Sequence, residues 1–233
     1  MKKIVLIIAV FFLSTLAFSA QTTKSLKLPA EGITKLSVDA GAGSLEILGV
    51  EGLSTIEVEA VINVDPLKES RFEDFLKDHL RFSLEKHNGE AVLKGFFEFE
   101  GFVLPRNASV DLKVRLPKAM NLYVDDGSGW ATVEGIRGDV EIDDGSGDLT
   151  VVDIEGNLTI DDGSGDIDIR NVTGDVRVDD GSGSMDIVKV GGSVTVDDGS
   201  GSIFIDDVGK DVILDSTGSG SVRTDRVRGR VVR

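Results

Sequence analysis

Paired aspartates recur through the second half of the chain, and acidic side chains at a fixed spacing are candidates for binding cations. The string DDGSG occurs five times at intervals of 18 residues. Strand alternation predicts that the first aspartate of each pair points outward. The metal-ligand candidates are therefore Asp125, Asp143, Asp161, Asp179 and Asp197. Calcium suits such a column because it accepts carboxylate oxygens in flexible numbers. A solvated acidic stripe without a bound ion is the alternative interpretation.

The second aspartate of each pair has a different predicted role. It stands where a strand enters a turn, and a short acceptor there can bond the glycine and serine amides that follow it, as in an Asx-turn. We expect this structural role for Asp126, Asp144, Asp162, Asp180 and Asp198.

Enzyme chemistry is disfavoured by the same repetition. A catalytic site needs unlike groups that converge on one point, whereas the repeat supplies equivalent groups in a row. The two histidines, His79 and His87, lie outside the repeat. We therefore predict no enzymatic activity, no catalytic residue and no cofactor. A cation-dependent, polysaccharide-active enzyme is the alternative.

The elements that position these aspartates follow from the 18-residue period. Each repeat has five apolar columns, illustrated by Ile167, Ile169, Val172, Val176 and Val178. Spacings of two indicate strands, β-branched residues dominate, and the spacing of three between Ile169 and Val172 requires a bend. The sequence predicts an all-β chain that forms a parallel β-helix (a β-solenoid) of 18-residue coils.

The array continues beyond the five identical corners. Residues 215–220, DSTGSG, correspond to a sixth corner with one residue inserted, after which Val222, Val227 and Val231 follow the columns shifted by one. Residues 36–52 are an early copy of the repeat, since VDAGAGSLEI matches VDDGSGSIFI at 196–205. We predict a signal peptide at 1–19 and one β-helix domain at 20–233, with a first coil at 36–52, an insertion at 53–118 and the repeat array at 119–233.

The insertion is expected to be a small α+β cap on the end of the β-helix. Segments 56–64, 80–84, 91–99 and 110–116 alternate as strands. Asp65 and Pro66 are typical of a helix start, and Phe72, Phe75, Leu76, His79 and Leu80 would share one helical face.

Aromatic residues mark a second candidate surface. Trp130 is the only tryptophan, and several phenylalanines lie between residues 96 and 102. Trp130, Phe97 and Phe99 are candidate contacts for a glycan or protein ligand. The alternative is that they pack where the insertion meets the first coil.

The N-terminus and the charge restrict location and partners. Lys2 and Lys3 precede an apolar run from Ile4 to Leu16, and Ala17-Phe18-Ser19 resembles a cleavage site. Removing this leader leaves 23 basic and 41 acidic residues, a net charge of −18. We expect a protein that is exported to the periplasm or the cell surface of a bacterium and does not span the membrane after cleavage. Its expected partner is a cell-surface protein or glycan, and nucleic acid is excluded.

The repeat resembles the bacterial DUF4097 group, whose members are labelled adhesins. The resemblance is carried by the pattern V-x-[D/T]-G-S-G-D-I-x-V with a following V-x-G, by VDLKVRLPKAMNLYVDDGSG at 110–129, and by LSVDAGAGSLEI at 36–47. It covers about residues 36–52 and 108–233. It implies an exported, β-helical, non-catalytic binding or structural module of the cell envelope, and it carries over no functional residues.

Overall fold

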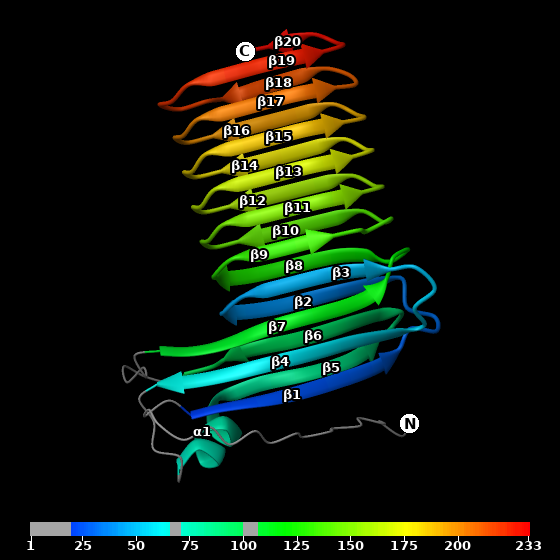
Figure 1. The fold of residues 1–233 in the computed structure, drawn as a ribbon, viewed down its shortest axis with the longest axis vertical. Coiled ribbons are helices and arrows are strands. Elements are labelled where there is room, and N and C mark those ends of the chain that lie inside the picture. Colours follow the sequence, from blue (N-terminus) through cyan, green and yellow to red (C-terminus); the bar gives the residue numbers. More distant parts are fainter. Residues whose placement is uncertain (1–19, 66–70, 100–106) are drawn as a thin grey trace.

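The chain forms two long β-sheets that lie face to face (Figure 1). The structure is a computed structural model that describes residues 20–65, 71–99 and 107–233, so the predicted signal peptide lies outside it. The described residues are almost entirely strands, turns and one short helix, α1 (Phe72–His79). The prediction of an all-β chain is confirmed.

Each sheet has ten strands among the described residues. The first sheet runs in the order β1 (Ala20–Pro29), β4 (Thr55–Asp65), β7 (Asn107–Pro117), β3 (Leu45–Val50), β9 (Ala131–Glu134), β11 (Leu149–Ile154), β13 (Ile167–Val172), β15 (Met185–Val190), β17 (Ile203–Val208) and β19 (Val222–Val227). The second runs in the order β20 (Val231–Val232), β18 (Val212–Ser216), β16 (Val194–Asp198), β14 (Val176–Asp180), β12 (Leu158–Asp162), β10 (Val140–Asp144), β8 (Asn121–Ser128), β2 (Lys35–Ala42), β6 (Glu90–Phe97) and β5 (Leu80–His87).

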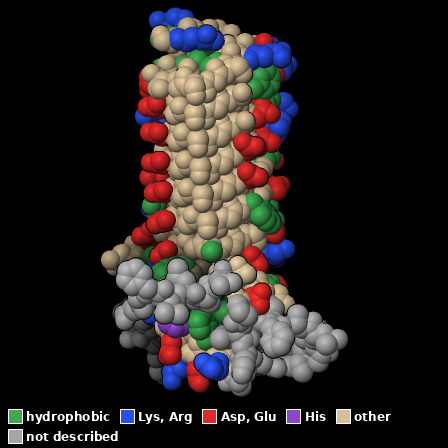
Figure 2. Space-filling model, turned by 90° about the vertical axis from the view of Figure 1, so that its left-hand side faces the viewer, with side chains coloured by type: hydrophobic (Ala, Val, Ile, Leu, Met, Phe, Trp, Pro, Cys, Tyr) green, Lys and Arg blue, Asp and Glu red, His purple; other side chains and the backbone are tan. Residues whose placement is uncertain are grey.

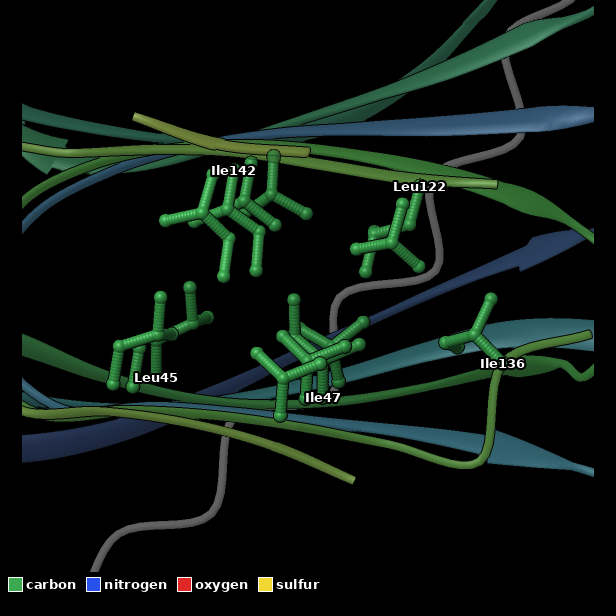
Figure 3. Close-up of a cluster of buried hydrophobic side chains, with 14 of the residues drawn as sticks. Leu45, Ile47, Leu122, Ile136 and Ile142 are labelled. Atoms are coloured by element: carbon green, nitrogen blue, oxygen red, sulfur yellow. The ribbon is translucent and has the colours of Figure 1, made fainter. Parts of the chain in front are cut away.

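The 18-residue period sets the register of both sheets. From β8 onward the chain alternates between the sheets, and each strand pairs in parallel with the strand one period away, as in Val151↔Ile169 and Ile160↔Val178. The early copy joins the same ladders, because β2 pairs with β8 and β3 pairs with β9. One residue in two along each strand faces inward, and these side chains form a continuous apolar core between the sheets. Figure 3 shows Ile142 and Leu122 on one side of this core, with Leu45, Ile47 and Ile136 opposite.

The predicted bend is present in the strands of the first sheet. Val151 and Ile154 are both buried, and Asp153 between them has a left-handed backbone with φ 59°. Asn171 (φ 60°) and Lys189 (φ 63°) repeat this conformation in the next two coils. The left-handed residue lets two inward side chains stand three positions apart.

The sixth corner contains the expected inserted residue. Asp197 pairs with Ser216 rather than with Asp215, so the ladder between β16 and β18 shifts by one residue there. Beyond the shift Val208 pairs with Val227 and Val212 with Val231, as the shifted columns predict.

Polar side chains connect successive coils at the corner opposite DDGSG. The Oδ1 atom of Asn121 accepts the backbone N–H of Asp139 at 3.0 Å, and Asp139 accepts that of Asn157 at 2.9 Å. In the same way, Asn157 Oδ1 accepts the backbone N–H of Asp175, and Asp175 Oδ1 accepts that of Ser193. Each side chain thus satisfies an amide of the coil above it.

The insertion lies at one end of the stack. Its strands β4, β7, β5 and β6 lengthen the two sheets there, because both sheet edges offer unpaired backbone groups. The predicted helix start at Asp65 is wrong: Asp65 ends β4, and α1 begins after Arg71, while Pro66 lies outside the described residues. Strand β1, which pairs antiparallel with β4, had no sequence prediction.

Candidate functional site

The DDGSG corners lie above one another and form one side of the stack. Figure 2 shows this side as a strip of backbone and small side chains bordered on both sides by acidic residues. The N–H of Gly145 donates to Asp126 O, and the N–H of Gly163 donates to Asp144 O, both at 2.8 Å. A β-carbon on Gly165, whose φ is +152°, would overlap the carbonyl of Gly147. The corners therefore stack by direct backbone contact.

The first aspartates form an outward column. Asp125, Asp143, Asp161, Asp179 and Asp197 are strand neighbours in register, and Asp39 of β2 lies next to Asp125. We call Asp125, Asp143, Asp161, Asp179 and Asp197 the outward aspartate column. Burial, followed by the charge of Asp125, raises the pKa of Asp39. The described residues contain no group of three or more histidine, cysteine, aspartate or glutamate side chains placed to hold a metal ion. Any cation on this column would have to bridge carboxylates of neighbouring coils.

The second aspartates are buried, with 1–2% of each residue exposed. We call Asp126, Asp144, Asp162, Asp180 and Asp198 the buried aspartate column. The expected turn bond is present at Asp144, Asp162, Asp180 and Asp198, whose Oδ1 atoms accept the N–H of the serine two residues later at 3.0–3.2 Å. At Asp126 this serine bond is absent.

Burial changes the titration of this column. It is the largest factor that raises the pKa of Asp126 to about 7, and the charge of Asp144 adds to it. Burial likewise raises the pKa values of Asp162 and Asp180 to about 6, with neighbouring aspartates adding and serine amides opposing. Asp144 and Asp198 shift in the same direction for the same first cause.

A groove of about 650 Å³ crosses the coils beside the corner strip. It lies between two side-chain columns, one at the end of each corner and one at the first outward position of the next strand. The corner column contributes Asp148, Asp166, Ser184, Ser202 and Ser221, and the outward column contributes Thr150, Asp168, Asp186, Phe204 and Arg223. The groove therefore presents carboxylates and hydroxyls at intervals of one coil.

Ion pairs and an aromatic contact order the walls of the groove. The guanidinium of Arg170 donates to Asp168 at 2.9 Å and lies 3.5 Å from Asp186 of the next coil. At the far end, Arg223 lies 5.3 Å from the centre of the Phe204 ring. The groove was not predicted from the sequence. The available signal was that two adjacent columns both hold polar side chains.

The aromatic candidates do not come together. Trp130 lies in the same corner column, beside Asp148 of the next coil, and 48% of it is exposed, so the packed alternative is wrong for this residue. Phe97 and Phe99 stack on each other with ring centres 5.9 Å apart, and both contact Phe75 of α1. The two phenylalanines thus belong to a partly buried aromatic cluster at the helix.

A second hollow of about 370 Å³ lies between β1, α1 and β5. Its apolar lining consists of Leu26, Leu76, Leu80, Phe82 and Leu84, and charged residues surround it. The histidines hold structural positions near this end: His79 Nδ1 is 3.2 Å from Glu98 O, and His87 Nε2 is 3.4 Å from Glu85. Neither histidine adjoins the groove. Among the described residues, no helix is long and apolar enough to span a membrane.

Comparison with known proteins gives similarity in structure alone. No family model and no curated protein sequence matches the chain. A "putative cell adhesion protein" of Clostridium sporogenes ATCC 15579 is 12% identical with a TM-score of 0.36, and covers 91% of this chain and 98% of its own. Two proteins of Parabacteroides distasonis ATCC 8503 are each 13% identical: a "putative lipid binding protein" (TM-score 0.47; 91% of this chain, 97% of its own) and a "putative adhesin" (0.41; 90% and 96%). At this level of similarity these names do not assign a function to the chain.

Proposed function

We propose that this chain is an exported, non-catalytic, adhesin-like protein of the bacterial cell envelope that binds an extended glycan along the groove. The observation that carries the proposal is the repetition of the groove: the same two columns of polar side chains cross several successive coils. A surface with a regular repeat suits a ligand that also repeats. Carboxylates and hydroxyls can accept and donate hydrogen bonds to sugar hydroxyls, and Trp130 in the same corner column offers an exposed ring.

The proposed architecture is a parallel β-helix of 18-residue coils in which each coil contributes one strand to each sheet. The in-register pairing over successive periods supports it. The resemblance to the DUF4097 group is proposed on the same motifs that form the stacked corners. Export is proposed from the N-terminal leader.

A glycan array probed with the purified protein tests the proposed function. We expect binding to one class of linear glycan, and loss of that binding in the double variant Asp168→Asn/Asp186→Asn, which removes two groove carboxylates. The matched control is Asp143→Asn/Asp161→Asn, which removes two carboxylates from the outward aspartate column. Loss of binding in both variants would show that general charge is responsible, and binding to cell-surface protein alone would exclude a glycan ligand.

An enzyme of the cell envelope is the competing class. Incubating the same glycans with the protein, with and without a chelator, separates the two classes. We expect no new reducing ends in either condition. Chelator-sensitive cleavage would replace the binding proposal with the polysaccharide-active alternative.

A further inference from the structure

The buried aspartate column is a feature that glycan binding does not use. Its five residues are in register in neighbouring strands of the second sheet. In Asp144, Asp162, Asp180 and Asp198 the Oδ2 atom is buried and has no hydrogen-bond partner, and in Asp126 both oxygens lack one. A buried carboxylate oxygen without a donor costs free energy if it is charged. The column therefore needs a ligand that removes this charge.

Among the described residues, the charged groups that raise the pKa values of the column are all acidic. The side chains that raise the pKa values of its members are the neighbouring buried aspartates, the outward Asp125, Asp143, Asp161 and Asp197, and Asp166. No lysine or arginine of the described chain forms an ion pair with the column, although such pairs occur elsewhere, as between Arg137 and Glu155. No side chain in the described part of the chain is thus in place to balance the negative charge.

The stacked corners leave no space for a metal ion. The backbones of successive corners are in contact, and the column lines neither the groove nor the hollow beside α1. Each level of the column offers one or two unpartnered oxygens, fewer than Ca²⁺ requires. A proton needs no cavity, and a protonated carboxyl becomes a hydrogen-bond donor to an oxygen of the neighbouring coil. The proton is the ligand that fits both the space and the chemistry.

We propose that the buried aspartate column is a multiple proton-binding site that stabilises the stacked coils in acid and weakens them as the pH rises through neutrality. In the unfolded chain an aspartate titrates near pH 4. Because folding raises the pKa of these side chains, the folded chain holds more protons than the unfolded chain between about pH 4 and pH 7. The stabilisation is complete below about pH 4 and is lost as the pH rises through about 6 to 7.

The column ends suggest which member binds its proton most tightly. Below Asp126 the ladder continues with Ala40, which can neither donate nor accept through its side chain. Asp126 also receives no serine amide. At the other end Asp198 has the Ser200 amide, and Ser216 Oγ donates to its carbonyl at 3.3 Å. Asp126 is therefore expected to be the last of the five to ionise.

The test is the pH dependence of unfolding of the whole protein. We expect the melting temperature to fall as the pH rises from 4.5 to 8.5 at constant ionic strength. Near pH 5 the slope should correspond to uptake of about three protons on folding, one each for Asp126, Asp162 and Asp180. In the triple variant Asp144→Asn/Asp162→Asn/Asp180→Asn the profile should be much flatter. Asparagine keeps the oxygen that accepts the serine amide and supplies an N–H₂ donor on the other side.

The matched control is Asp143→Asn/Asp161→Asn/Asp179→Asn, which removes the same charge from the outward aspartate column. It should keep the slope of the unmodified protein. Equal flattening in both triple variants would overturn the proposal. If the buried variant does not fold, infrared spectroscopy of the unmodified protein decides. Protonated carboxyl bands that persist at pH 5.5 support the proposal of proton binding, and their absence contradicts it.

Discussion

Glycine at the start of the corner is required by contact with the coil below at Gly145, Gly163, Gly181 and Gly199. Gly163 is exposed to solvent, yet a β-carbon there would lie 2.5 Å from the carbonyl oxygen of Gly145. At the equivalent position of the first full corner, a β-carbon on Gly127 would meet Gly41 only at 3.5 Å, an ordinary contact. We expect Gly163→Ala to lower the free energy of unfolding by about 1 to 3 kcal/mol, since the coils must separate to admit the methyl group.

Gly127→Ala is the matched substitution for this test, and we expect it to change stability by less than about 0.5 kcal/mol. Urea unfolding of both variants gives the comparison. Similar losses of unfolding free energy in the two variants would show that the corner needs glycine for its backbone freedom, which both glycines share, and not for close stacking.

At the scale of the element, the bend in the first sheet requires one residue in each coil to adopt a left-handed backbone conformation. The residues at this position differ in how easily they adopt it. Asn171 adopts it at low cost, whereas Lys189 does not have a short polar side chain that bonds locally. Asn171 Nδ2 also donates to Asp153 Oδ1 of the preceding coil at 2.8 Å. Lys189→Asn is expected to stabilise the protein by about 0.5 to 1 kcal/mol.

Arg177→Asn is a suitable control for this element, because Arg177 is also exposed but lies in the extended strand β14. Asparagine is unfavourable in strands, so this change should be neutral or slightly destabilising. Thermal melts of the two variants measure the difference. A gain in both, or in neither, would argue against the backbone explanation.

The elements that the repeat specifies could be predicted from the sequence, and those outside it could be predicted only in part. Columns of equivalent residues fix the register, the bend and the inserted residue near Asp215, because a stacked coil must place the same residue types at the same height. The start of α1 was placed too early, because Asp65-Pro66 has the chemistry of a helix start in a segment that β4 reaches. No repeat and no clear alternation marked β1.

The candidate site was predicted less completely for a related reason. The alternation that places Val178 inward also places Asp180 inward, and the turn chemistry of the second aspartate concealed this consequence. The groove depends on two columns from consecutive segments, and neither column is regular alone. The sequence therefore revealed which residues stack from coil to coil, but not which columns lie side by side.

At the scale of the whole molecule, the distribution of negative charge opposes compactness. The full chain carries a net charge of −16, and acidic side chains run in rows along the stack (Figure 2). The outward aspartate column adds to this, because its carboxylates are strand neighbours about 4.8 Å apart. Salt should therefore stabilise the folded chain by screening these charges.

Divalent cations should act more strongly than screening alone. An ion that bridges two neighbouring carboxylates of the outward aspartate column binds the folded chain preferentially and stabilises it by mass action. We expect millimolar CaCl₂ to raise the melting temperature above that in NaCl of matched ionic strength. Because the described residues contain no group of three or more ligand side chains placed to hold a metal ion, the excess should be small. It should disappear in Asp143→Asn/Asp161→Asn/Asp179→Asn. Identical melting curves in the two salts would mean that the column is a solvated stripe, which keeps the protein soluble without a bound ion.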